Sequence, residues 1–276
     1  MIRFGFIGYG SMSSMLIKGL INQAGINQSE IIVTRKDILK LQEIKDNWPQ
    51  INLASDAVEV AKTASYLFIC VKPIEIKNIL TEIKEVLLPD SHIISIAGSL
   101  LISDINRIID CKITKFLPTV ISEVNEGISL ICHNNKVSDM DKAYLETLLG
   151  SFTNIKRTLE KHFEIATIFT SCGPGLYAAI VNEFIEAGLR YSDCFTKEEL
   201  NQMVGQSVSG TVKLVQDKKV DFSTVIQRVA TKGGLTEEGV NDLEAHLPAL
   251  FDHMLLKMRD KQRLIFDKIH NEYIIS

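Results

Sequence analysis

The sequence contains few of the residues that build metal and redox centres. Its 276 residues include only five cysteines and six histidines. The cysteines are scattered without Cys-x-x-Cys spacing, and no His-x-x-x-His or His-Glu-x-x-His pair is present. His246 and His253 could share one helix face, but no further ligand lies near them in the sequence. We therefore expect reduced, mostly buried thiols and no bound metal.

A large excess of one charge is also missing, as is any long apolar stretch. The chain has 34 acidic and 30 basic residues, and this balance favours neither a nucleic acid nor a membrane surface as a partner. The N-terminus lacks a secretory signal pattern, and no apolar stretch approaches the roughly 20 residues of a membrane span. We expect a soluble, cytoplasmic protein that acts on a small molecule.

The start of the chain carries the most informative pattern. The apolar run Ile2–Ile7 breaks at the sequence G-Y-G-S-M-S and continues with helical periodicity. This order indicates a strand, a tight turn and a helix N-terminus, where free backbone N–H groups attract a pyrophosphate. The third place of the dinucleotide fingerprint is the small residue Ser13, and a plain glycine turn is the alternative. The predicted dinucleotide-binding residues are Gly8, Gly10, Ser11 and Met12.

The first half of the chain alternates short β-branched runs with amphipathic patterns. This alternation is typical of a parallel sheet covered by helices. Strands are predicted at Ile2–Ile7, Glu30–Thr34, Tyr66–Val71, His92–Ile96 and Lys112–Phe116. An edge strand is expected at Gly127–Cys132, a helix at Ser138–Leu149 and one more strand at Asn154–Thr158. Residues 1–159 are therefore predicted to form a doubly wound α/β domain of the Rossmann type.

After about Leu159 the periodicity becomes helical. Helices are predicted at Lys161–Thr170, Gly175–Tyr191, Lys197–Gln216, Asp221–Thr231, Thr236–Glu244 and Pro248–Ile269. Several of them are apolar on more than one side, which exceeds what a small domain can bury alone. We expect residues 160–276 to form an all-α domain that mediates homodimerisation, with a higher oligomer left open.

Residues after three predicted strands are candidates for the rest of a cofactor site. Thr34, Arg35 and Lys36 stand where an acidic residue would bind the ribose of NAD. A hydroxyl and two cations suit the 2′-phosphate of NADP instead, so we expect NADP(H) ahead of NAD(H); a solvated basic pair is the alternative. In open α/β sheets, ligands lie beyond the carboxyl ends of the strands. This rule adds Val71, Lys72, Pro73, Ala97 and Gly98.

Two glycine-containing segments interrupt the helical half. The sequence S-C-G-P-G at 171–175 breaks the pattern before the first long helix. The sequence V-A-T-K-G-G-L-T-E-E-G-V at 229–240 places Thr236 where it would cap a helix. Free N–H groups around Gly234 and Thr236 could also hold a substrate carboxylate.

Together these segments resemble pyrroline-5-carboxylate reductases over nearly the whole chain. The resemblance is carried by F-G-F-I-G-Y-G-S-M, I-C-V-K-P, G-P-G-L-Y and, most specifically, V-A-T-K-G-G-L-T-E-E-G-V. It implies NADPH-dependent reduction of 1-pyrroline-5-carboxylate to L-proline. It also implies that Thr236 hydrogen-bonds the substrate nitrogen, which makes Thr236 the candidate catalytic residue. The substrate-binding residues implied are Thr231, Gly233, Gly234, Leu235 and Thr236.

Two segments depart from the family pattern. The usual Met-Pro-Asn-Thr-Pro reads L-P-T-V-I at 117–121, and the usual Gly-Ser-Gly-Pro-Ala reads S-C-G-P-G at 171–175. Both are expected near the nicotinamide and the substrate, and the first lacks a hydrogen-bonding asparagine. The altered segments are similar to a divergent branch that includes competence-operon paralogues. A non-enzymatic, NADP-binding paralogue is therefore the second hypothesis.

A third hypothesis is a β-hydroxyacid dehydrogenase, which has the same domain order. That family places a catalytic lysine on the first long helix after its glycine-rich stretch, to move a proton to and from the alcohol, and Tyr177–Val181 contains none. The reductase needs fewer polar residues, because the cofactor drives hydride transfer and solvent can protonate the imine before binding. The protein then mainly has to hold two rings face to face.

Overall fold

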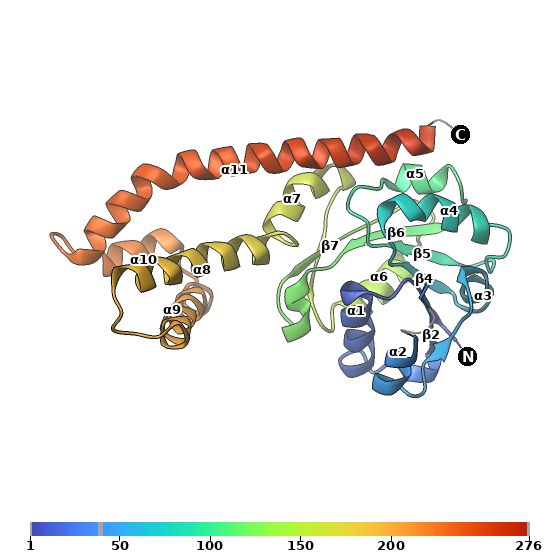
Figure 1. The fold of residues 1–276 in the computed structure, drawn as a ribbon. Coiled ribbons are helices and arrows are strands. Elements are labelled where there is room, and N and C mark those ends of the chain that lie inside the picture. The colour runs from blue at the N-terminus through green and yellow to red at the C-terminus, as the bar shows by residue number, and fades with distance from the viewer. Residues whose placement is uncertain (1, 38–40, 275–276) are drawn as a thin grey trace. The chain divides into compact units, whose positions relative to one another are not determined.

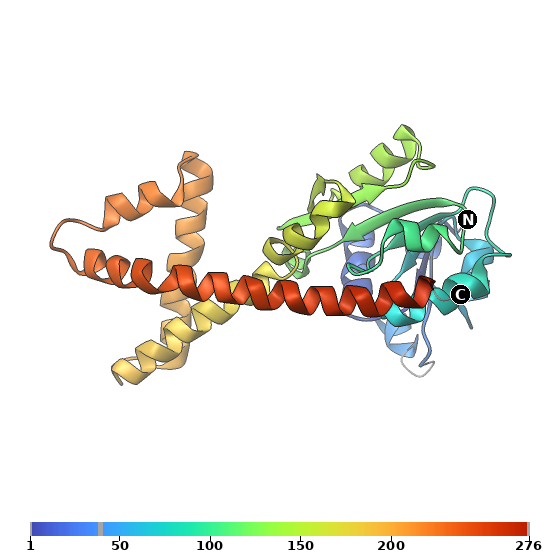
Figure 2. The ribbon, with the colours of Figure 1, turned by 90° about the horizontal axis from the view of Figure 1, so that it is seen from above.

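The computed structural model describes residues 2–37 and 41–274, which divide into two compact units. The first unit comprises Met1–Pro174 together with Lys261–Ser276, and the second comprises Gly175–Asp260. Both ends of the chain belong to the first unit (Figure 2). The boundary predicted between residues 159 and 160 rests on a change of sequence pattern, whereas these two units are defined by spatial contact. The predicted boundary therefore stays a prediction.

An eight-stranded sheet forms the centre of the first unit in the described part of the chain (Figure 1). Its order is β3-β2-β1-β4-β5-β6-β7-β8, and every neighbouring pair is parallel except β6 and β7. This arrangement confirms the predicted doubly wound fold. The strands are β1 (Phe4–Ile7), β2 (Ile31–Thr34), β3 (Asn52–Leu53), β4 (Tyr66–Ile69), β5 (His92–Ser95), β6 (Lys112–Leu117), β7 (Ile128–His133) and β8 (Asn154–Arg157).

Two details of the sheet differ from the expectation. The strand β3 was not predicted, because two residues are too few to show an alternation. The strand β7 was expected at the edge of the sheet, but β8 lies outside it and pairs with it in parallel. Sequence periodicity predicts that a segment is extended, but it does not say which strands will be neighbours.

Helices cover both faces of the sheet, as the nearly continuous apolar strands require. Along β1, Phe4 and Phe6 face one core and Ile7 faces the other, in keeping with the two-residue period of a strand. Figure 1 shows α3, α4 and α5 on one side of the sheet and α1 and α2 on the other. The helices are α1 (Ser11–Asn22), α2 (Leu41–Asn47), α3 (Ala57–Thr63), α4 (Pro73–Ile83), α5 (Ile102–Asn106) and α6 (Asp139–Leu149).

The end of the last helix, α11 (Leu235–Ile274), also packs in the first unit. Ile269 and Tyr273 are buried in the same hydrophobic cluster as the residues of α3, α4 and α5. The ring of His270 places Nδ1 3.0 Å from Oδ1 of the fully buried Asp104. The C-terminal turns of the chain are thus part of the core of the nucleotide-binding fold.

The remainder of the chain is helical, as predicted, with one correction. Residues 236–244 and 248–269 were expected to form two helices, but α11 is continuous and contains Pro248. A proline removes one helix hydrogen bond and bends the axis, yet the helix can continue when the residues on both sides favour it. The other helices are α7 (Phe163–Phe169), α8 (Gly173–Tyr191), α9 (Lys197–Lys218) and α10 (Phe222–Val229).

The segment Glu160–Tyr191 is long and apolar enough to cross a membrane by length and composition alone, and an 18-residue stretch of it has a mean hydropathy of 1.3. We expected no apolar stretch approaching the roughly 20 residues of a membrane span, so this segment was not predicted. The segment is not one helix, since α7 ends at Phe169 and α8 begins at Gly173. Large side chains of α8, including Tyr177 and Phe184, are exposed in this single chain.

Candidate cofactor and substrate sites

The turn after β1 has a shape that only glycine tolerates. Gly8 has a φ of +100°, and a Cβ there would lie 2.6 Å from the carbonyl oxygen of Cys70. The Gly8 N–H donates to the carbonyl oxygen of Thr34 at 2.9 Å. The three strands β1, β2 and β4 are therefore drawn together directly beneath the turn.

Gly10 has the opposite environment. It precedes α1 with extended backbone, and a Cβ there would have no atom within 4 Å. No side chain caps this helix, and no acidic residue occupies its first turn. The N–H groups of Ser11 and Met12 at the start of α1 thus have no capping side chain, and the space beside Gly10 is open, which fits a pyrophosphate at a helix N-terminus.

A cavity of about 210 Å³ lies beside the turn and contains the predicted cationic segment. Thr34, Arg35 and Lys36 line it together with Gly8 and Val71. Arg35 is half-buried and has no hydrogen bond or ion pair with any residue described, so its charge is available to an anion. The cavity therefore offers apolar side chains and a free guanidinium to the adenosine half of NADP, and two acidic residues, Asp56 and Glu82, line it as well.

The other predicted cofactor residues follow β4 and β5 at the same edge of the sheet. In the strand register Ile7 pairs with Ile69, and Ile69 pairs with Ser95, so the loops after these strands are neighbours. Lys72 precedes α4 and Pro73 occupies its first turn, as the pattern predicts. Ala97 is buried, and a Cβ on Gly98 would lie 3.2 Å from Leu117 Cδ2. The loops after β4 and β5 therefore lie side by side beyond the strand ends, and the second of them contains the small residues Ala97 and Gly98.

Sequence reasoning missed several residues that line the adenosine cavity. Most come from α3, the residues just before it, and α4, segments whose sequences carry no motif for nucleotide binding. Ile79 and Glu82 of α4 line the cavity, and Glu75 lies on the same helix stripe by its spacing. The remaining contributors are Ile7 of β1, Ser55 and Asp56 before α3, and Ala57 of α3.

The G-G-L-T segment lies in the second unit and differs from the expected cap. The helix α11 begins at Leu235, so Thr236 is inside its first turn and is not the capping residue. Gly233 has a φ of +73° and donates its N–H to Glu237 Oε2 at 2.6 Å. The Gly234 N–H donates to the Thr231 carbonyl oxygen at 2.8 Å. Two N–H groups that we expected to be free are therefore occupied.

The Thr236 side chain remains available. It is exposed, and no hydrogen bond of its hydroxyl occurs within residues 2–37 and 41–274. Leu235 beside it is 92% exposed. A Cβ on Gly234 would lie 2.8 Å from Thr231 Oγ1, so the turn is packed from within while its outer side stays open.

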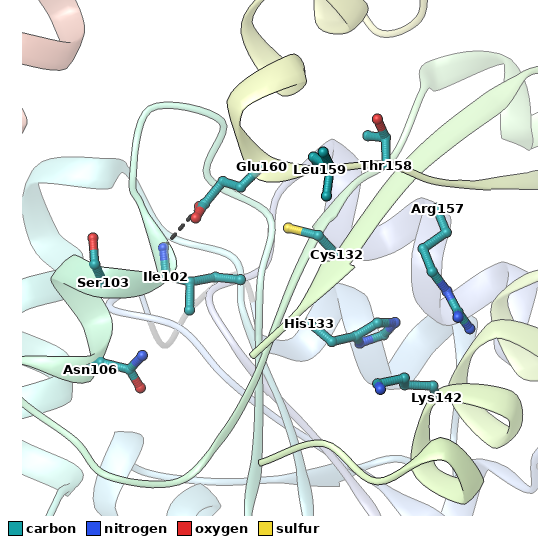
Figure 3. A pocket seen from close by; sticks show the side chains of 10 residues that line it. All are labelled: Ile102, Ser103, Asn106, Cys132, His133, Lys142, Arg157, Thr158, Leu159 and Glu160. Atoms are coloured by element: carbon teal, nitrogen blue, oxygen red, sulfur yellow. Dashed lines mark hydrogen bonds between the residues drawn. The ribbon is translucent and has the colours of Figure 1, made fainter. Parts of the chain in front are cut away.

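A second cavity, of about 650 Å³, lies at the opposite edge of the sheet (Figure 3). Because β7 runs antiparallel to β6, with His133 opposite Thr114, the end of β7 lies near the start of β6. Figure 3 shows Arg157 and Lys142 on one side and Glu160 on the other, and Glu160 accepts a hydrogen bond from Ile102. None of the residues that we predicted for cofactor or substrate lines this cavity.

An open glycine turn beside a cavity lined by Arg35 and Lys36, on a doubly wound sheet, is typical of a dinucleotide-binding domain. The family model described as NADP oxidoreductase coenzyme F420-dependent matches residues 3–99, so the protein is an NADP-dependent oxidoreductase in class. The family model described as Pyrroline-5-carboxylate reductase dimerisation matches residues 160–264. The chain belongs to the pyrroline-5-carboxylate reductase family.

Individual relatives support this assignment over nearly full length. Pyrroline-5-carboxylate reductase 3 of Bacillus subtilis is 30% identical and covers 98% of both chains. ComE operon protein 4 of the same organism is 24% identical and covers 91% of both. The crystal structure of Plasmodium falciparum pyrroline carboxylate reductase with NADP bound has a TM-score of 0.83 at 25% identity, covering 96% of this chain and 98% of that one. The resemblance predicted from the motifs is confirmed.

Proposed function

We propose that the protein reduces 1-pyrroline-5-carboxylate to L-proline with NADPH. The observation that carries the proposal is the G-G-L-T turn, which presents an unoccupied Thr236 hydroxyl at the first turn of α11. A hydroxyl in the first turn of a helix suits a substrate with a ring nitrogen and a carboxylate, because the positive end of the helix dipole attracts the carboxylate. The similarity to relatives named as pyrroline-5-carboxylate reductases supports the same reaction.

The cofactor-side residues have distinct tasks in this proposal. The N–H groups that follow Gly10 would hold the pyrophosphate, and Arg35 would hold the 2′-phosphate. When bound, NADPH would supply the hydride for the imine carbon, and the imine nitrogen would already carry its proton. Thr236 would hydrogen-bond that nitrogen and orient the ring, so most of the protein's contribution is positioning.

An absorbance assay tests the reaction. Purified protein is mixed with NADPH and 1-pyrroline-5-carboxylate, and separately with NADP and β-hydroxy acids. We expect NADPH oxidation and stoichiometric proline with the imine, and no NADP reduction with the hydroxy acids. Reduction of NADP by a hydroxy acid would instead identify a dehydrogenase.

The second candidate is an NADP-binding paralogue without this activity. It is favoured by the altered segments at 117–121 and 171–175 and by the similarity to ComE operon protein 4. Tight NADPH binding without oxidation by any cyclic imine would favour the paralogue, because the cofactor half of the fold would then be retained alone.

We also propose that the protein is a soluble cytoplasmic homodimer joined through its helical half. The support is the dimerisation family model over residues 160–264 and the exposed apolar side chains of α8. A second copy would cover this surface and account for the apolar character of Glu160–Tyr191 without a membrane. Light scattering on the purified protein is expected to give twice the chain mass or an even multiple of it.

A further inference from the structure

An ion pair joins a residue that lines the adenosine cavity to a helix beside it. Lys36, at the end of β2, pairs with Glu75 of α4 through Nζ and Oε1. Lys36 lines the cavity, and Glu75 lies one helical turn from Ile79, which also lines it. The pair therefore connects the two elements between which the adenosine half would enter.

The two cations of this segment are not equivalent. Arg35 is half-buried without a protein partner among the residues described, whereas Lys36 is already neutralised by a carboxylate. The Lys36 ammonium holds the pKa of Glu75 below its ordinary value, so the carboxylate is ionised at neutral pH. A 2′-phosphate bound here would form an ion pair with Arg35 directly, but it would form one with Lys36 only in competition with Glu75.

We propose that Glu75 is a specificity-determining residue that lowers the affinity for NADPH by holding Lys36 away from the 2′-phosphate. NADH has no phosphate at this position, so it neither competes for Lys36 nor meets the Glu75 charge. Glu75 thereby narrows the preference for NADPH over NADH. The inference concerns cofactor binding alone and stands apart from the imine reaction.

Equilibrium binding of the full-length protein tests the inference, with NADPH and NADH fluorescence as the readout and no imine present. We expect Glu75→Gln to lower the Kd for NADPH by about two- to fivefold, the scale of one exposed ion pair, and to change the Kd for NADH by less than about twofold. The gain should shrink as salt is raised, because exposed charges are screened. An unchanged Kd for NADPH, or an equal change for NADH, would overturn the inference.

Glu85→Gln is the matched control for net charge. Glu85 follows α4, is exposed and contacts only Lys84 among the ion pairs of the described chain, so its loss removes one negative charge without touching the Lys36–Glu75 pair or a residue that lines the cavity. We expect it to leave both Kd values within about twofold of the wild type. If Glu85→Gln tightens NADPH binding as much as Glu75→Gln does, overall charge accounts for the effect and the inference fails.

A double-mutant cycle separates the role of Lys36 from direct repulsion. In a Lys36→Gln background, Glu75→Gln should change the Kd for NADPH by less than about twofold, because no cation remains to be released. Persistence of the full gain in that background would mean that Glu75 repels the phosphate without Lys36. Thermal unfolding of each variant verifies that the fold is intact.

Discussion

Ser171 Oγ donates a hydrogen bond to the carbonyl oxygen of Pro118 at 3.0 Å, which joins the two segments that depart from the family pattern. A second contact runs the other way, since Thr119 Oγ1 donates to the carbonyl oxygen of Thr170 at 3.4 Å. Thr119 is 1% exposed, so the residue in place of the usual asparagine uses its hydroxyl within the protein. The two departing segments therefore contact each other directly through Ser171 and Pro118.

Removing either hydroxyl of this contact should weaken the fold. Ser171→Ala and Thr119→Val each leave a carbonyl oxygen without its donor, which lowers the free energy of unfolding by about 1 kcal/mol. Because both bonds join the same two segments, the double variant should lose less than the sum of the single losses. Urea unfolding measures all three. Strict additivity would mean that the two contacts are independent.

Gly8 and Gly10 should respond oppositely to alanine. Gly8→Ala would place a Cβ against the Cys70 carbonyl at a φ of +100°, so the free energy of unfolding should fall by about 2 kcal/mol or more. Gly10→Ala meets nothing within 4 Å, so stability should change by less than about 0.5 kcal/mol. NADPH binding by the Gly10 variant should nevertheless weaken at least about tenfold, because the methyl group occupies the phosphate's approach. Calorimetric titration that gives a wild-type Kd for Gly10→Ala would exclude this placement of the pyrophosphate.

Thr236→Ala should lower turnover on 1-pyrroline-5-carboxylate without disturbing the cofactor. We expect kcat to fall about ten- to hundredfold, the scale of one hydrogen bond made in the transition state. The Kd for NADPH should stay within about twofold, and Thr236→Ser should restore most of the activity, because it restores the hydroxyl. Steady-state kinetics with both variants measure this effect. Unchanged turnover in the alanine variant would remove Thr236 from the mechanism.

The free energy of unfolding should fall as the pH drops below about 6.5, the ordinary pKa of histidine. His92 is 1% exposed, and its Nε2 lies 2.6 Å from Thr114 Oγ1, which in turn lies 2.7 Å from His133 Nδ1. Burial, and then the neighbouring His133, lower the pKa of His92 to about 4. The histidine pKa in the unfolded chain is about 6.5. Between about pH 6.5 and pH 4, His92 is therefore protonated in the unfolded chain and neutral in the folded chain.

The sign and size of this effect follow from linkage. The contribution of His92 is complete above about pH 6.5 and is lost as the pH falls toward 4, which amounts to about 2 kcal/mol between pH 7 and pH 5. His92→Phe keeps an aromatic ring against Tyr66 and removes the proton-binding group, so its unfolding free energy should vary less over that range. Equal pH dependence in the two proteins would assign the acid sensitivity to other groups.

Much of the nucleotide-binding half was predictable because its signals are local. The strand at Tyr66–Ile69 and the turn at Gly8 follow from apolar runs and from a backbone that only glycine adopts. Thr34, Arg35 and Lys36 line the cavity because a parallel sheet brings its strand ends to one edge. The pairing of Lys36 with Glu75 was not predictable, since those residues are far apart in the sequence and no motif links them.

The order of elements, the glycine turn and the family were determined by the sequence alone, because each depends on neighbouring residues or on a short motif. Tertiary structure decided which partners those residues meet. It placed β8 outside β7, joined the segments at 118 and 171, and continued α11 through Pro248. These outcomes depend on packing between distant parts of the chain, and packing is a property of the assembled fold that local periodicity does not encode.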